Sequence, residues 1–305
     1  MPIVKSKKEE SDSMHPPGDD QFSPQKPKFS FNDLVLSDLI RNEIMDVLSI
    51  QQLQSHVFDT WGLAHTHKLQ KKIALNFYGE PGTGKTMAAH AVAHYLDKDI
   101  IEVNYADIES KYVGDTPKNL TRVFKKAKET NSVLFFDEAD AMLSKRVTNM
   151  SSSTDTSVNQ TRSVLLMLLN DFDGIIVFAT NFVSNYDVAF MRRILGHVEF
   201  KLPCHVERTK IWNHLLPKDL PHNADVAKLA EKFDCVSGSD ISNAILKAAF
   251  KAARNSEDIV CHDYFEHAIE SIRHSKKMNL NIKGGDEKIE IRTVSKEYVE
   301  SQVNI

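Results

Sequence analysis

Short apolar runs alternate with amphipathic stretches through the middle of the chain. The apolar runs predict five strands, at Ile73–Tyr78, Ile100–Asn104, Val133–Phe136, Ile175–Ala179 and Val198–Leu202. Their nearly continuous apolar character is typical of strands covered on both faces. Helical patterns lie between them, as at Thr86–Leu96 and Lys118–Glu129. The pattern therefore predicts an α/β fold, in which a mostly parallel sheet has helices on both sides.

The segment before the first strand divides into two parts. Residues 1–30 combine five prolines with mixed charges and few apolar residues, so we expect a disordered tail. Order is expected from about Phe31. Ser37 is a suitable N-cap for an amphipathic helix with Ile40, Ile44 and Leu48 at four-residue spacing.

After Pro203 the pattern is helical. Helices are predicted at Glu207–Leu216, Val226–Phe233, Asp240–Arg254 and His262–Ile272. We therefore expect an α/β domain over residues 31–202, a small all-helical domain over 203–280 and an extension over 281–305, where Lys288–Val294 can form an edge strand. The Ser/Thr-rich stretch from Val147 to Val158 is expected to be a mobile loop.

Composition narrows the class of protein. Hydrophobic residues are 41% of the 305 and charged residues 26%, as in ordinary globular chains. No apolar run approaches the roughly 20 residues of a membrane span, and the formal net charge of −4 disfavours a nucleic-acid binder. Three separated cysteines without CxxC spacing and no leader pattern predict a reducing, cytoplasmic location.

The strongest chemical signal is a glycine-rich loop between a predicted strand and a predicted helix. Gly79-Glu80-Pro81-Gly82-Thr83-Gly84-Lys85-Thr86 satisfies G-x-x-x-x-G-K-[ST]. In such a loop, backbone N–H groups and the helix N-terminus cradle phosphates. Lys85 would then reach the β- and γ-phosphates of ATP, and Thr86 would bind Mg²⁺. The alternative is a glycine turn with an exposed lysine.

Polar residues follow two later strands. Asp137 and Glu138 end the run Val133–Phe136, where Asp137 can hold the Mg²⁺ water shell and Glu138 can activate the attacking water. Asn181 follows the next strand and can contact the γ-phosphate or that water. The alternatives are a solvated strand end and an ordinary turn residue.

Arg192 and Arg193 stand eleven residues further on. They can be ordinary exposed residues of a surface helix. They can also act as arginine fingers, which accelerate phosphoryl transfer by about 10³–10⁵. Their distance in sequence from the glycine-rich loop favours a role at the nucleotide of a neighbouring subunit.

Taken in order, these motifs resemble the AAA family of AAA+ ATPases. The resemblance rests on GEPGTGKT, FFDEAD, FATN, Asp187–Arg193 and Val236–Ile241, and covers about residues 31–275. It implies a five-stranded parallel α/β domain, a helical lid with ATP between the two, and assembly into rings, usually hexamers. Asn181 resembles the sensor 1 residue, Arg192 and Arg193 resemble the trans-acting fingers, and Gly238-Ser239 resembles the lid segment near the adenine.

The resemblance also implies a pore loop, and the sequence departs from the family's usual pattern at some positions. Lys111, Tyr112 and Val113 match a loop whose aromatic residue lines a central channel, although Tyr112 can also be an ordinary half-buried loop residue. Glu80 stands where the family usually has proline, and Leu36 where it commonly has glycine, among the expected base contacts Leu34–Leu36. Ile194-Leu195-Gly196 replaces the commoner Arg-Pro-Gly-Arg, so which arginine makes the closer contact is open.

The leading hypothesis is a homo-oligomeric, hexameric ring that hydrolyses ATP to remodel, unfold or disassemble a protein substrate, with an adaptor recruited by the N-terminal tail. The alternative is an ATP-dependent assembly switch or loader that acts on a partner complex or DNA without threading. A P-loop kinase with a small-molecule acceptor is a third possibility. It is disfavoured because Glu138, Asn181 and the two arginines would then have no purpose.

Overall fold

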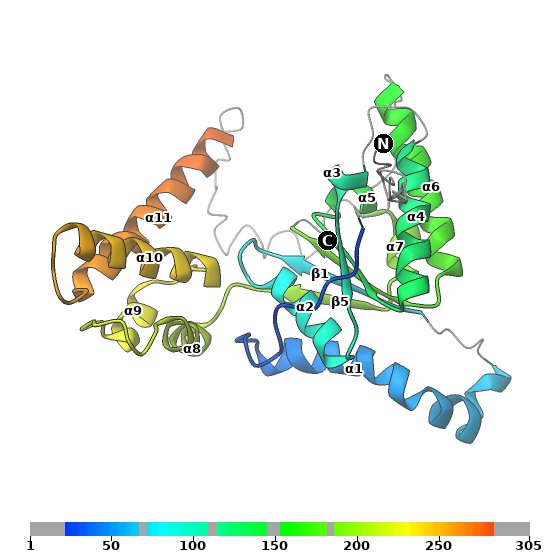
Figure 1. Ribbon diagram of the computed structural model, residues 1–305, viewed down its shortest axis with the longest axis horizontal. Helices are drawn as coiled ribbons and strands as arrows, with labels where there is room; N and C mark the ends of the chain where they lie inside the picture. Colours follow the sequence, from blue (N-terminus) through cyan, green and yellow to red (C-terminus); the bar gives the residue numbers. More distant parts are fainter. Residues whose placement is uncertain (1–21, 67–71, 109–114, 145–152, 182–185, 284–305) are drawn as a thin grey trace, which may run out of the picture. The chain divides into compact units, whose positions relative to one another are not determined.

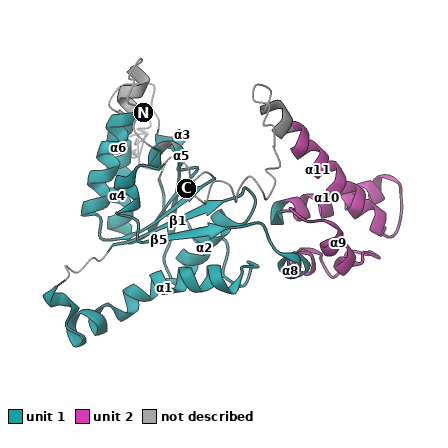
Figure 2. Cartoon of the chain, turned by 180° about the vertical axis from the view of Figure 1, so that it is seen from behind, with its two compact units in different colours: residues 1–210, 237–239 teal, residues 211–236, 240–305 magenta. Residues whose placement is uncertain are grey.

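The computed structural model describes residues 22–66, 72–108, 115–144, 153–181 and 186–283. It divides into two compact units (Figure 2). The first comprises residues 1–210 with 237–239, and the second comprises 211–236 with 240–305. The first unit thus extends beyond the predicted boundary at residue 202, because α8 (His205–Leu215) begins in it and ends in the second unit.

The first unit is built on a five-stranded parallel sheet with the order β2-β3-β4-β1-β5. Its strands are β1 (Ile73–Gly79), β2 (Ile100–Asn104), β3 (Val133–Asp137), β4 (Ile175–Thr180) and β5 (Gly196–Phe200). The α/β prediction is confirmed. The last strand begins and ends two residues earlier than predicted.

Helices cover both faces of this sheet (Figure 1). The helices α1 (Asp38–Ser55) and α2 (Lys85–Tyr95) pack on the face that carries Leu75 and Phe77. The helices α4 (Asp115–Thr130) and α6 (Ser153–Asp171) pack on the opposite face. The connections hold α3 (Tyr105–Ile108), α5 (Asp140–Leu143), α7 (Val188–Met191), the π-helix η1 (His56–Thr60) and the 3₁₀ helix η2 (Leu63–His65).

The predicted cap of α1 is confirmed. The Ser37 side chain accepts a hydrogen bond from the Ile40 N–H, and Ile44 and Leu48 are buried in the core.

The prediction of a disordered tail to residue 30 was wrong for residues 22–30. Phe22 is only 4% exposed and belongs to the core cluster on the α4 and α6 face. Gln25 and Ile100 exchange both backbone hydrogen bonds at 2.8 Å, which pairs this segment with the open edge of β2. Edge pairing satisfies backbone groups that composition alone does not reveal. Residues 1–21 lie outside the described part of the chain.

The loop expected over Val147–Val158 was wrong from Ser153 onward, where α6 begins. Leu165 and Leu169, one turn apart, are fully buried between the sheet and α4. This packing of the later turns outweighs the weak helix propensity of the Ser/Thr-rich first turns. Residues 145–152 lie outside the described part.

The second unit contains α9 (Val226–Lys232), most of α10 (Gly238–Arg254) and α11 (His262–Lys283). Trp212 of α8 and Phe265 of α11 meet edge to face in its core. The all-helical prediction is confirmed, and α11 continues past the predicted end at Ile272. The edge strand expected at Lys288–Val294 lies outside the described residues. No helix within the described ranges has the length and apolar character needed to cross a membrane.

Candidate functional site

The glycine-rich loop leaves the carboxyl end of β1 and enters α2 at Lys85. Gly82 has φ +76°, a backbone conformation that residues with a Cβ rarely adopt. Its carbonyl accepts a hydrogen bond of 3.2 Å from the Ser239 N–H, and an added Cβ would lie 2.1 Å from the Ser239 Oγ. The loop therefore packs against Gly238-Ser239, a segment that the sequence analysis placed near the nucleotide.

We expect Gly82→Ala to weaken nucleotide binding by at least about tenfold, because both the positive φ and the Ser239 hydroxyl oppose a Cβ. Titration with a fluorescent ATP analogue measures the loss. Gly62→Ala is the matched control, since Gly62 also has φ +76° but lies outside the loop, with its nearest contact at 3.4 Å. Equal nucleotide affinity in the two variants would contradict the prediction.

The Lys85 side chain is hydrogen-bonded to the glycine-rich loop. Its Nζ donates to the carbonyl oxygens of Gly79 at 2.8 Å and Glu80 at 2.9 Å, and the residue is only 8% exposed. Burial lowers the pKa of Lys85, while Asp137, Asp140 and Glu80 act in the opposite direction. The ammonium thus lies at the start of the loop that leads into α2, and the N–H groups in the first turn of that helix have no acceptors within it. Both features favour a bound phosphate group.

Thr86 and Asp137 come together from the two motifs. The Thr86 Oγ1 donates a 2.9 Å hydrogen bond to the Asp137 Oδ2, although 51 residues separate them. A hydroxyl and a carboxylate are the oxygen ligands that Mg²⁺ prefers, so this pair fits that ion.

Glu138 follows Asp137 with φ +50° and an exposed side chain. Its N–H donates to the Asp137 Oδ1 at 2.9 Å. Such a conformation is unfavourable for a residue with a Cβ, and it persists at functional positions where the surroundings enforce it. Here it turns the chain directly after β3.

Asp140 is a site residue to which the sequence analysis gave no role. Its carboxylate oxygens lie 3.2 and 3.4 Å from the Asn181 N–H, which donates to them. The Ala139 N–H also donates to the Ala179 carbonyl at 2.9 Å. The ends of β3 and β4 are thereby joined, and Asn181 lies beside Asp140. The sequence feature that could have pointed to this role is that Asp140 is the third carboxylate in the FFDEAD run.

The two arginines differ. The Arg193 Nε donates to the Asn170 Oδ1 at 2.7 Å, and its Nη1 donates to the Ala189 carbonyl at 2.8 Å. Arg192 is exposed, and its guanidinium makes no hydrogen bond or ion pair with any residue the structure describes. Of the two, Arg192 is therefore the one available to another molecule.

Of the other residues predicted to contact nucleotide or substrate, the expected base contacts are described by the structure and the expected pore residues are not. Leu34 lies beside the glycine-rich loop, 3.8 Å from where a Cβ of Gly84 would stand. Leu36 packs against the core of the α1 and α2 face. The predicted pore residues Lys111, Tyr112 and Val113 lie outside the described residues.

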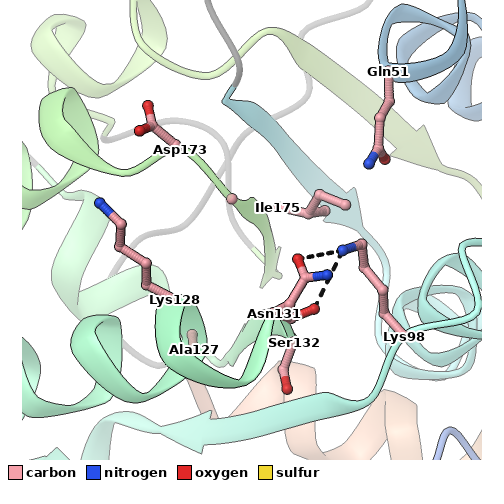
Figure 3. Close-up of a pocket in the computed structure, with 9 residues that line it drawn as sticks. Gln51, Lys98, Ala127, Lys128, Asn131, Ser132, Asp173 and Ile175 are labelled. Atoms are coloured by element: carbon pink, nitrogen blue, oxygen red, sulfur yellow. Dashed lines mark hydrogen bonds between the residues drawn. The ribbon is translucent and has the colours of Figure 1, made fainter.

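A cavity of about 100 Å³ lies elsewhere, at the amino ends of the strands (Figure 3). Ser132 and Ile175, which line it, adjoin the starts of β3 and β4, whereas the glycine-rich loop follows the end of β1. The Lys98 Nζ reaches across to Asn131 there. The cavity is far smaller than ordinary cofactor pockets and is separate from the site described above.

Comparison with known families gives two matches. Residues 75–202 match the model of the "ATPase family associated with various cellular activities (AAA)". Residues 27–102, which include the glycine-rich loop, match the model of parvovirus non-structural protein NS1.

Over the aligned residues, curated relatives are about a third identical to this chain. The 26S proteasome regulatory subunit 6B homolog of Encephalitozoon cuniculi is 30% identical over 81% of this chain and 64% of its own length. The 26S proteasome regulatory subunit 8 homolog of Saccharomyces cerevisiae is 33% identical over 78% and 58%. Subunit 8 of Caenorhabditis elegans is 32% identical over 79% and 58%. The chain thus spans about three fifths of the length of these relatives.

Proposed function

The chain belongs to the AAA family of ATPases, and we propose that it binds and hydrolyses ATP at the interfaces of a ring of its own copies to remodel a protein substrate. The observation that carries the proposal is the convergence of Lys85, Thr86 and Asp137 at the carboxyl edge of the sheet. Ligands of open parallel sheets bind at this edge.

Each residue has a separate task in this proposal. Lys85 and the loop N–H groups bind the phosphates, while Ser239 closes against the loop beside the adenosine end. Thr86 and Asp137 would hold Mg²⁺, which neutralises charge on the β- and γ-phosphates. The carboxylate of Glu138 accepts a proton from the attacking water. Asn181, held by Asp140, orients that water.

Arg192 supports a site shared between two protomers. Its exposed guanidinium, which has no partner among the described residues, stands at the end of α7 and suits the charge that develops on a transferring phosphoryl group. We propose a homohexamer, in which Arg192 of one protomer completes the site of the next. The relatives' names, which mark them as subunits of the 26S proteasome, support a function within an assembly. We also propose that the chain is cytoplasmic and that residues 1–30 bind an adaptor.

The assembly itself is directly testable. We expect the Glu138→Gln chain to form rings when ATP is added and to dissociate when ATP is removed, as measured by light scattering after size exclusion. Phosphate release by the unmodified chain should rise more than linearly with protein concentration, because the active site needs two protomers. A strictly monomeric chain that hydrolyses ATP at full speed would overturn the proposal.

Tyr112 tests whether substrate is pulled through the ring. We expect Tyr112→Ala to abolish substrate remodelling while at least half of the ATPase activity remains, because aromatic faces grip polypeptide without taking part in hydrolysis. Capture of substrate by Glu138→Gln rings identifies the protein on which to measure remodelling. Tyr95→Ala, which changes a 45% exposed tyrosine, is the control. Unchanged remodelling by Tyr112→Ala would favour the assembly switch that acts without threading.

A further inference from the structure

A polar cluster is buried inside the apolar layer between the sheet and its α4 and α6 face. Asn76 is 0% exposed, Thr180 1% and Tyr186 8%. The Asn76 Nδ2 donates to the Tyr186 hydroxyl at 3.5 Å, and that hydroxyl is also hydrogen-bonded to the Thr180 Oγ1. The Asn76 Oδ1 has no hydrogen-bond partner among the described residues. Buried amides disfavour folding unless they are fully paired, so core packing gives no reason for Asn76.

The three residues come from segments with different tasks in the proposed site. Asn76 lies in β1, three residues before the glycine-rich loop. Thr180 ends the neighbouring strand β4 and directly precedes Asn181. Tyr186 precedes Asp187, whose carboxylate caps the N-terminus of α7 by accepting from the Ala189 N–H at 2.8 Å.

The backbone of α7 is attached on its other side to the acidic motif. The Asp187 N–H donates to the Leu143 carbonyl at 2.9 Å, and Ser144 forms an antiparallel bridge with Tyr186. Leu143 ends α5, which begins at Asp140. Two sets of contacts therefore hold the start of α7. One is made with the backbone of Leu143 and Ser144 after β3, and the other joins the Tyr186 hydroxyl to a side chain of β1 and a side chain of β4.

From this arrangement we propose that Tyr186 is a positioning residue, whose hydroxyl fixes α7, and with it Arg192, to the strands that carry the chain's own nucleotide site. The inference rests on the proposed function, because it requires Arg192 to act on a neighbour. It assigns Asn76 and Thr180 as the two groups to which that hydroxyl is tied. Burial raises the pKa of Tyr186, so the hydroxyl keeps its proton at neutral pH.

The first experiment separates positioning from stability. Tyr186→Phe leaves the Asn76 amide without its acceptor, and we expect the melting temperature to fall by about 2–4 °C. In the variant that combines Tyr186→Phe with Asn76→Leu and Thr180→Val, no side chain of the cluster keeps an unpaired polar group, and the melting temperature should return. We expect kcat for ATP to stay about tenfold reduced in both variants, with nucleotide affinity unchanged. Recovery of kcat together with the melting temperature would overturn the inference.

The matched control is Tyr264→Phe, which removes a tyrosine hydroxyl that is hydrogen-bonded to Asn255 and Glu257 in the second unit. We expect it to leave kcat unchanged. A tenfold loss of kcat in this control as well would show a general effect of lost hydroxyl groups and would also overturn the inference.

The second experiment tests where Tyr186 acts. Glu138→Gln protomers, which keep Arg192, are mixed with Arg192→Ala protomers, which keep Glu138, so that hydrolysis arises only between unlike neighbours. Adding Tyr186→Phe to the Glu138→Gln protomers should lower this activity about tenfold. A loss only when Tyr186→Phe is on the Arg192→Ala protomers, or no loss, would overturn the inference. Absence of activity before Tyr186 is changed would overturn the shared site, and the inference with it.

Discussion

Glu138→Gln is expected to lower ATP turnover by about 10²–10⁴-fold while ATP binding persists. An amide has nearly the shape of the carboxylate but cannot take a proton from water, so the general-base contribution is lost. Lys85 and the Thr86–Asp137 pair, which carry phosphate and Mg²⁺ binding in the proposal, are unchanged in this variant. Steady-state phosphate release gives kcat, and titration with labelled ATP gives the affinity.

Asp140→Asn provides a comparison for this variant, because it is the same chemical change two residues along the chain. The amide oxygen can still accept from the Asn181 N–H, so we expect a loss of kcat of less than about tenfold. If Glu138→Gln retains full turnover, Glu138 has no role as a base and another group must activate water. A large loss in Asp140→Asn with none in Glu138→Gln would exchange the roles of the two residues.

Arg192→Ala is expected to lower kcat by about 10³-fold, the lower end of the range for arginine fingers. Because the guanidinium serves another protomer, the variant's own glycine-rich loop is intact and its nucleotide affinity should be unchanged. Mixing it with Glu138→Gln protomers should restore part of the activity, since each chain then supplies what its neighbour lacks. Two inactive chains with a shared site can regain activity in this way, whereas two chains with self-contained sites cannot.

Arg193→Ala separates the two arginines. Arg193 is hydrogen-bonded within its own chain to Asn170 and Ala189, so its loss should lower the melting temperature more than Arg192→Ala does. We expect a smaller loss of kcat than in Arg192→Ala, and no rescue of activity by Glu138→Gln protomers. Rescue of Arg193→Ala, with none of Arg192→Ala, would assign the finger to Arg193.

Much of the site could be predicted because its residues follow strands. Parallel strands bring their carboxyl ends to one edge, so Thr86, Asp137 and Asn181 converge there once the strands are recognised. The Ser/Thr-rich start of α6 and the segment at 22–30 could not be predicted in the same way. The burial of Leu165 and the pairing of Gln25 with Ile100 depend on partners distant in sequence.

The sequence by itself determined the α/β architecture, the phosphate-binding loop, the acidic pair and the helical second unit, because each depends on local periodicity or on a contiguous motif. Only the tertiary structure decided that Arg193 is held within its own chain, that Arg192 has no partner in the described part of the chain, and that Asp140 holds Asn181. It also revealed the Tyr186 cluster. The physical reason is that these hydrogen bonds form where segments distant in sequence come into contact, and residue type and spacing do not specify that contact.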